Sequence, residues 1–211
     1  MASSMKNSAL IALALSGAAI LGYVAYRAIP PEQVAAPVAA DTATDELEPT
    51  ASALGVLPEF SLATLSGEQR SILDWPDRAL IINFWATWCA PCLREIPLLK
   101  EFQTTHEDDG VQVVGIAVDR LEPVKAFAAD MGFNYPQLIG EADAMEAAAS
   151  FGIDFFALPF TVFTDPDRNV LGVHTGEIHP EDLENLAAVL ADLRAGAIEL
   201  DEARARVAGR I

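Results

Sequence analysis

The chain has 211 residues, of which 52% are hydrophobic, and it carries a formal net charge of -18 at pH 7. This length fits one or two domains, and the apolar fraction is ample for a packed core. So acidic a chain is unsuited to nucleic acid, because phosphate binding needs clustered Lys and Arg. Two interpretations of the charge stay open, a solvated surface or a field that steers the protein toward basic partners.

The N-terminal segment is predicted to be a membrane anchor. Residues 7–26 contain no charged side chain. A run of about 20 such residues can cross a bilayer, whereas the apolar part of a signal peptide usually has about 7–15 residues. We therefore favour one uncleaved transmembrane helix within residues 1–27 over a cleaved signal, although residues 38–40 (Val-Ala-Ala) offer small side chains for cleavage. Residues 28–57, rich in Pro and Ala, are predicted to form a disordered linker.

Strands and helices alternate along the rest of the chain. In chain order we expect a hairpin at 60–73, a strand at 79–85, a helix from about 89 to 106, a strand at 111–118, helices at 122–131 and 141–151, strands at 160–164 and 170–175, and a helix at 180–193. Residues 199–207 are expected to extend that last helix along the surface. The pattern predicts an α/β fold with a mixed central sheet flanked by helices, in one domain over 58–195 with a helical tail at 196–211.

The chain has two cysteines, Cys89 and Cys92, and their Cys-x-x-Cys spacing has three possible uses. Structural zinc needs four ligands, and none of the three histidines has ligand spacing with the pair, so no metal site is predicted. A purely structural disulfide would close too short a loop to stabilise the fold much. The remaining use is thiol–disulfide exchange.

The position of the pair favours a redox-active dithiol. A helix is expected to begin near Cys89, where backbone N–H groups and the helix dipole stabilise a thiolate. Cys89 is therefore predicted to be the exposed nucleophile. Cys92, one turn later and more buried, is predicted to attack the mixed disulfide and release the partner. Pro91 is tolerated in the first helical turn, and Trp88 is expected to shield one side of the sulfur.

The segment NFWATWCAPCLREIP, residues 83–97, resembles the active-site region of the thioredoxin superfamily. More narrowly, it resembles the TlpA/ResA branch of membrane-anchored, extracytoplasmic thiol–disulfide oxidoreductases. The resemblance covers about residues 58–195. It implies a thioredoxin-like fold with an N-terminal hairpin and a strand–helix insertion at 111–151, and a chemistry that needs no bound cofactor.

Further positions match that family. The segment 158–161 (Leu-Pro-Phe-Thr) resembles its cis-proline element, which implies that Pro159 is cis and faces Cys89 and that the backbone of Leu158 pairs with an extended substrate. Pro97 matches a proline that kinks the active-site helix. Asp119, at the end of an expected strand, is predicted to be a cap or loop residue.

The proton-handling group is expected to differ from that of thioredoxins proper. Asn83 stands where those proteins have a buried Asp, and an amide cannot serve as that base. Glu95 matches an acidic residue of the TlpA/ResA branch. If Glu95 is desolvated beside the sulfurs, its pKa rises and it can shuttle protons. The alternative is an exposed helix carboxylate without a role.

The resemblance also implies partners and a compartment. It implies a reductase of protein disulfides, with apocytochrome c or copper-delivery and oxidase-assembly proteins as substrates. A membrane protein of the DsbD/CcdA type would donate the electrons. The domain would lie in the periplasm, held to the bacterial inner membrane by the N-terminal helix. The residues between the cysteines do not fix the potential, which spans about -270 to -120 mV among such dithiols. A net oxidase therefore stays open. A peroxidase and a thioredoxin-fold binding or chaperone module are further alternatives that stay open.

Overall fold

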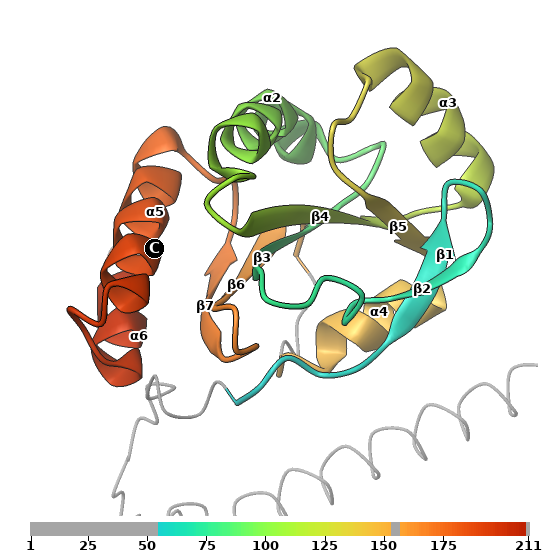
Figure 1. Ribbon diagram of the computed structural model, residues 1–211. Coiled ribbons are helices and arrows are strands. Elements are labelled where there is room, and N and C mark those ends of the chain that lie inside the picture. The colour runs from blue at the N-terminus through green and yellow to red at the C-terminus, as the bar shows by residue number, and fades with distance from the viewer. Residues whose placement is uncertain (1–54, 153–156, 210–211) are drawn as a thin grey trace, which may run out of the picture. The chain divides into compact units, whose positions relative to one another are not determined.

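The computed structural model describes residues 55–152 and 157–209, which form a seven-stranded mixed sheet with the order β2-β1-β5-β4-β3-β6-β7 (Figure 1). The expected anchor at 1–27 and the expected linker, up to residue 54, lie outside the described residues. Within the described part of the chain, no helix is long and apolar enough to cross a membrane.

The sheet carries helices on both faces. The strands are β1 (Ser61–Thr64), β2 (Gln69–Ser71), β3 (Ala79–Trp85), β4 (Val111–Val118), β5 (Gln137–Gly140), β6 (Phe160–Thr164) and β7 (Val170–Thr175). The helices are α2 (Ala90–His106), α3 (Leu121–Met131), α4 (Ala142–Ala149), α5 (Pro180–Arg194) and α6 (Leu200–Ala208). In Figure 1, α2 and α3 lie above the sheet and α4 below it, while α5 and α6 lie beside β7.

β3 is the central strand, and its side chains build a core on each face of the sheet. It runs parallel to β4 and antiparallel to β6, and all seven of its residues are buried. Because side chains alternate along a strand, Ile81 packs with α2, α5 and α6, whereas Ile82 packs with α4 on the opposite face. This double burial explains why residues 79–85 are apolar except for Asn83.

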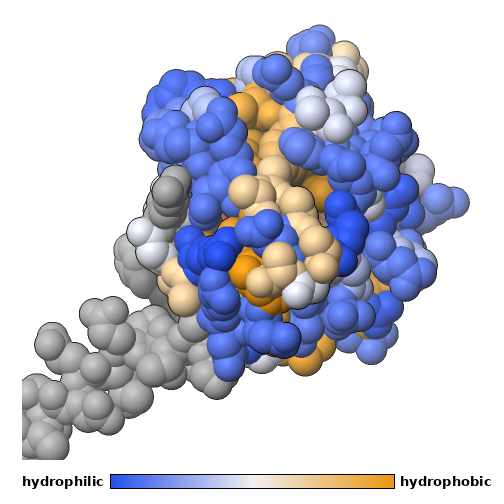
Figure 2. Space-filling view, turned by 60° about the vertical axis from the view of Figure 1, so that its left-hand side comes forward, coloured by the Kyte–Doolittle hydropathy of each residue, from blue (hydrophilic) through white to orange (hydrophobic). Residues whose placement is uncertain are grey.

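The surface is mostly hydrophilic, in keeping with the charge of the chain. Figure 2 shows hydrophilic side chains over most of one face, with hydrophobic side chains gathered in a hollow between them. Acidic groups outnumber basic ones 31 to 13, so negative charge dominates the polar part of the surface.

The α/β class, the mixed sheet and the opening hairpin are confirmed. The strands at 79–85, 111–118, 160–164 and 170–175 have the predicted bounds. β5 was not predicted, although it joins the hairpin to the sheet by pairing antiparallel with β1 and parallel with β4. Its four residues are all buried, so the segment is too short and too uniform to show strand periodicity.

The expectation that residues 199–207 extend the preceding helix along the surface is wrong. Gly196, with φ of +66°, lies between α5 and α6, and this left-handed conformation ends a helix readily. α6 then packs against β7, with Ala203 and Val207 fully enclosed. Arg204 Nε donates a hydrogen bond to the Val170 carbonyl at 3.0 Å. The C-terminal segment therefore belongs to the core of the domain.

Candidate active site

Cys89 and Cys92 form a disulfide at the N-terminus of α2, with their Cα atoms 5.3 Å apart. Cys89 is the N-cap residue, and the Cys92 backbone N–H points at its Sγ at 3.3 Å. A helix-terminal N–H in that position stabilises negative charge on Sγ when the pair is reduced. Cys92 is fully buried and Cys89 is 5% exposed, so their order is as predicted but Cys89 is more enclosed than expected.

The loop before Cys89 is fixed by a carboxylate from the neighbouring strand. Asp119 Oδ2 accepts hydrogen bonds from the backbone N–H of Thr87, at 3.2 Å, and from its hydroxyl. Because β3 and β4 are parallel, their carboxyl ends meet at one edge of the sheet, and this brings Asp119 beside the loop. Asp119 lies in a loop, as predicted. Its hydrogen bonds to Thr87 were not predicted, although an acidic residue directly after a parallel strand could have indicated them.

Two further predicted residues flank the cysteines on the chain. Pro91 lies in the first turn of α2, where a missing N–H costs nothing, and Pro97 lies inside the helix. Trp88 is 71% exposed, so most of its indole faces solvent. Such an exposed side chain shields the sulfur less than expected, and a substrate can contact it.

The expected cis-proline loop lies beside the disulfide. The Leu158–Pro159 peptide bond is cis, as predicted. Leu158 packs against the apolar cluster that contains both cysteines. The register pairs Phe84 with Phe160, which brings Pro159 to the sheet edge from which the loop to Cys89 leaves. Substrate pairing at Leu158, and the orientation of the Pro159 ring toward Cys89, stay predictions.

Glu95 is buried, one turn beyond Cys92 on α2, with only 1% of its surface exposed. Its Oε1 accepts a hydrogen bond from Asn83 Nδ2 at 2.7 Å, and its Oε2 accepts one from the Ile178 backbone N–H at 2.9 Å. Burial raises the pKa of Glu95 to about 7, and the two hydrogen bonds offset only part of that effect. The alternative of an exposed helix carboxylate is therefore wrong, whereas the role of Glu95 in moving protons stays a prediction.

Asn83 connects Glu95 to β6. It is fully buried, and its Nδ2 also donates to Thr161 Oγ1 at 3.0 Å. Within the described residues, no donor reaches Asn83 Oδ1. Since that oxygen is free to accept, rotation of the amide by half a turn would let Asn83 accept a hydrogen bond from a protonated Glu95. The hydrogen bond from the Ile178 N–H to Glu95 joins residues that are 83 positions apart, and no sequence pattern predicted it.

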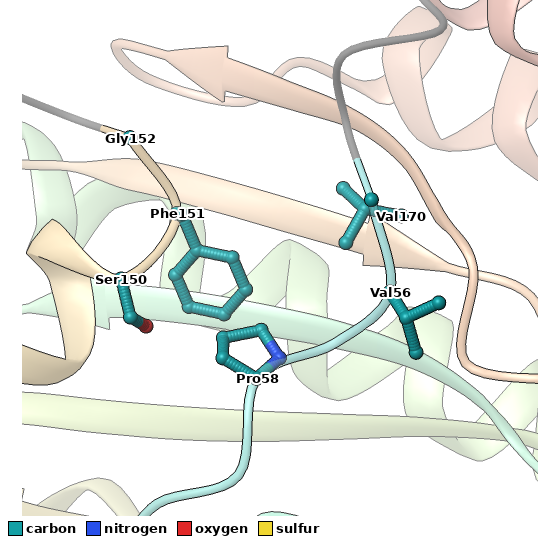
Figure 3. A pocket seen from close by; sticks show the side chains of 7 residues that line it. Val56, Pro58, Ser150, Phe151, Gly152 and Val170 are labelled. Carbon is teal, nitrogen blue, oxygen red and sulfur yellow. The ribbon is translucent and has the colours of Figure 1, made fainter.

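The molecule also has a cavity of about 270 Å³ away from this chemistry (Figure 3). Val56, Pro58 and Phe151 line it, together with Ser150, Val170 and two glycines. Phe151 and Val170 pack with the core on the α4 face, opposite the disulfide. None of the described residues that line this cavity has a titratable side chain. The candidate active site is therefore the Cys89–Cys92 region, where the disulfide and a buried carboxyl group lie.

Comparison with known proteins gives consistent matches. The family model described as Redoxin matches residues 53–190. The thiol-disulfide oxidoreductase ResA of Geobacillus kaustophilus is 33% identical over 141 residues, covering 65% of this chain and 78% of the relative. The thioredoxin-like protein YneN of Bacillus subtilis is 32% identical over 131 residues, covering 60% and 74%. A solved thiol:disulfide interchange protein of the thioredoxin family from Chlorobium tepidum has 31% identity and a TM-score of 0.56, covering 65% of this chain and 94% of that one.

Proposed function

Since this chain belongs to the Redoxin family, as a TlpA/ResA-like member of the thioredoxin superfamily, we propose that it reduces disulfides in other proteins through Cys89 and Cys92. Disulfide oxidoreductase activity and a thioredoxin-like fold follow from the family itself. The direction of electron flow, the substrates and the compartment are the parts of this function that we propose.

The observation that carries the proposal is the position of a buried carboxyl group one turn beyond a cysteine pair at a helix N-terminus. In the reduced enzyme, the Cys89 thiolate attacks one sulfur of a substrate disulfide. The substrate S–S bond breaks, one substrate sulfur leaves as a thiolate and takes up a proton, and a mixed disulfide with Cys89 forms.

The second step uses Cys92 and Glu95. Cys92 gives its proton to the Glu95 carboxylate and attacks Cys89 Sγ, so the mixed disulfide breaks. The second substrate sulfur leaves as a thiolate and takes up a proton from solvent. Two electrons have then passed from the enzyme dithiol to the substrate, and the enzyme is left with the Cys89–Cys92 disulfide found in the structure. With a pKa of about 7, Glu95 can both accept and return a proton at neutral pH.

The cycle requires a source of electrons. A dithiol of a membrane protein of the DsbD/CcdA type attacks the Cys89–Cys92 disulfide and restores the dithiol. The substrates are the cysteines of apocytochrome c or of copper-delivery and oxidase-assembly proteins in the periplasm. The charge-free run at residues 7–26 supports this arrangement, because a helix there would hold the domain at the inner membrane.

The test is a trapping experiment with Cys92→Ala in the native bacterium. Without the resolving thiol, Cys89 is expected to remain joined to its substrate, and mass spectrometry identifies the attached protein. Cys89→Ala/Cys92→Ala is the matched control, which must capture nothing. Recovery of no thiol partner would contradict the exchange function.

The direction of electron flow is tested by the reduction potential of the purified protein in glutathione buffers. A value toward the reducing end of the range, about -270 mV, supports a reductase. A value near the oxidising end, about -120 mV, would replace it with a net oxidase.

A further inference from the structure

The loop between β7 and α5, residues 176–179, covers the Glu95 carboxyl group, and we call it the covering loop. Its Ile178 N–H donates to Glu95 Oε2 at 2.9 Å, and the Ile178 side chain is itself buried. At its start, the Gly176 N–H donates to the Pro159 carbonyl at 2.9 Å. The loop therefore connects the cis-proline to the buried carboxyl group.

A bidentate ion pair joins this loop to α2 beside Glu95. Arg94 Nε lies 3.0 Å from each carboxylate oxygen of Glu177, and Arg94 Nη2 donates to one of them as well. The Arg94 side chain is 61% exposed and that of Glu177 23% exposed. Within residues 55–152 and 157–209, Arg94 is the only side chain that hydrogen-bonds the Glu177 carboxylate.

The two contacts are adjacent on both segments. Arg94 and Glu95 are consecutive on α2, and their partners Glu177 and Ile178 are consecutive in the covering loop. One contact lies at the surface and the other in the interior. A planar guanidinium that bonds both oxygens of a carboxylate restricts distance and angle together, which a single bond does not.

We propose that Arg94 and Glu177 are positioning residues, whose ion pair holds the covering loop closed over Glu95 and keeps water from its carboxyl group. The catalytic consequence of this inference rests on the proposed function, in which Glu95 exchanges a proton with Cys92. Exposed ion pairs usually add little to global stability. We therefore expect Arg94 and Glu177 to affect local opening of the loop and not unfolding of the domain.

Opening of the covering loop would change the chemistry of Glu95. Burial is the largest cause of its raised pKa, so access of water would move that pKa from about 7 toward its ordinary value of 4.5. Glu95 would then stay ionised at neutral pH and would return a proton poorly. The other charged or titratable groups near Glu95 are Glu177, whose charge raises the pKa, His179, which lowers it, Tyr135 before β5, and Cys92 on its own helix.

The test separates the position of the loop from the charges on it. The pKa of Glu95 is followed by NMR of carboxyl carbons in the full-length protein. If only charge matters, Arg94→Gln raises this pKa because Glu177 is left unpaired, and Glu177→Gln lowers it. If the ion pair holds the loop, both variants lower the pKa, and so does Arg94→Gln/Glu177→Gln, in which the net charge is balanced.

A second readout reports on the loop directly. Hydrogen exchange of the Ile178 amide is expected to rise about tenfold in both single variants and in the double variant. Slow exchange should return in the charge swap Arg94→Glu/Glu177→Arg, which restores the pair in reverse. Arg206→Gln is the matched control, since Arg206 also forms surface ion pairs, with Asp192 and Glu202, but lies on α6, and it should leave Ile178 exchange unchanged.

Opposite movements of the Glu95 pKa in the two single variants, or unchanged Ile178 exchange in all of them, would overturn the proposal. Neither readout depends on catalysis. Failure of Cys92→Ala to trap a partner would therefore contradict the proposed function. It would not affect the inference about the loop, which is tested by the Glu95 pKa and by Ile178 exchange.

Discussion

The Glu95 carboxyl group is held in the interior by two hydrogen bonds, yet its pKa of about 7 means that burial penalises its charge more than the bonds stabilise it. The folded-state pKa lies above the ordinary value of 4.5, which the unfolded chain has. Stability from this group is therefore fully present below pH 4.5 and is lost as the pH rises through 7. Over that range the loss reaches about 3 kcal/mol.

We predict that Glu95→Gln removes this pH dependence. The variant should gain stability relative to the native protein as the pH rises from 5 to 8, by up to about 3 kcal/mol, because a neutral amide has no charge to bury. Urea unfolding across that range measures the difference. Glu101→Gln, at an exposed site on the same helix, is the control and should show no such trend. A Glu95→Gln curve parallel to the native curve would contradict the raised pKa.

Asp119 shows that a single side chain can position the reactive loop without touching sulfur. Removing its carboxylate in Asp119→Ala leaves the Thr87 N–H and hydroxyl without their acceptor. We expect a loss of about 1–2 kcal/mol in stability and a fall of about tenfold or more in the rate of disulfide exchange, because displacement of Cys89 is costly to the reaction geometry. Unfolding curves and exchange kinetics with a model disulfide measure the two effects.

Asp165→Ala is the matched control for Asp119. Asp165 also holds a loop, by accepting hydrogen bonds from the Asn169 backbone and side chain at 2.7 and 2.8 Å. It lies in the turn after β6, at the opposite end of that strand from Pro159. This variant should lose stability to a similar degree and keep its exchange rate. Equal slowing of both variants would assign the effect of Asp119 to general destabilisation.

At the scale of helices and strands, the elements that were predicted correctly are those whose burial leaves a recognisable pattern in the sequence. β3 and β4 are apolar except for one amide side chain each, Asn83 and Gln112, and their bounds were predicted correctly because strands buried on both faces have that pattern. β5 escaped prediction because four buried residues have no visible period. α6 was recognised as a helix, but its docking on β7 depends on which distant strand it meets, and a local pattern does not contain that information.

The same limit applies to the candidate site. The two cysteines, Pro159 and Glu95 were found because they stand within or near short motifs of the chain. Ile178 acts through its backbone N–H and has no side-chain signature, and Glu177 gains its role only from the approach of Arg94. Contacts between segments this far apart follow from the topology of the sheet, not from the residues on either side.

The contact between β7 and α6 makes a stability prediction at this scale. A Cβ atom added at Gly172 would lie 2.5 Å from Val207 Cγ1, and a valine in a helix has little freedom to rotate away. Gly172→Ala should therefore cost about 1–3 kcal/mol through overpacking. Val207→Ala should cost about 1–3 kcal/mol through lost burial.

The double variant tests whether the two residues act on one another. In Gly172→Ala/Val207→Ala the added methyl group enters the space that the valine leaves. The loss measured by urea unfolding should be smaller than the sum of the single losses by about 0.5–1 kcal/mol or more. Additive losses would place α6 away from Gly172. Disulfide exchange serves as a control readout and should be unchanged, because neither residue belongs to the apolar cluster around the cysteines.

At the scale of the whole molecule, charge determines how a substrate approaches. The chain has a net charge of -18, whereas the charged pair nearest the disulfide in the sequence, Arg94 with Glu177, is neutral overall. That pair adds no net charge at the site, so the field there is set by Asp119 beside the loop and by the acidic surface of the rest of the molecule. Such a field changes association rates, and salt screens it.

We predict that a peptide disulfide with several lysines reacts faster than the same peptide with glutamates, by about tenfold at low salt. Raising the ionic strength from about 0.01 M to 0.15 M shortens the screening length from about 30 Å to 8 Å. The cationic peptide should then slow, the anionic peptide should accelerate, and a neutral peptide should change little. Stopped-flow tryptophan fluorescence of the oxidation of Cys89 and Cys92 measures all three rates. If the cationic and anionic peptides respond to salt in the same way, the acidic surface solvates the protein and does not select its partners.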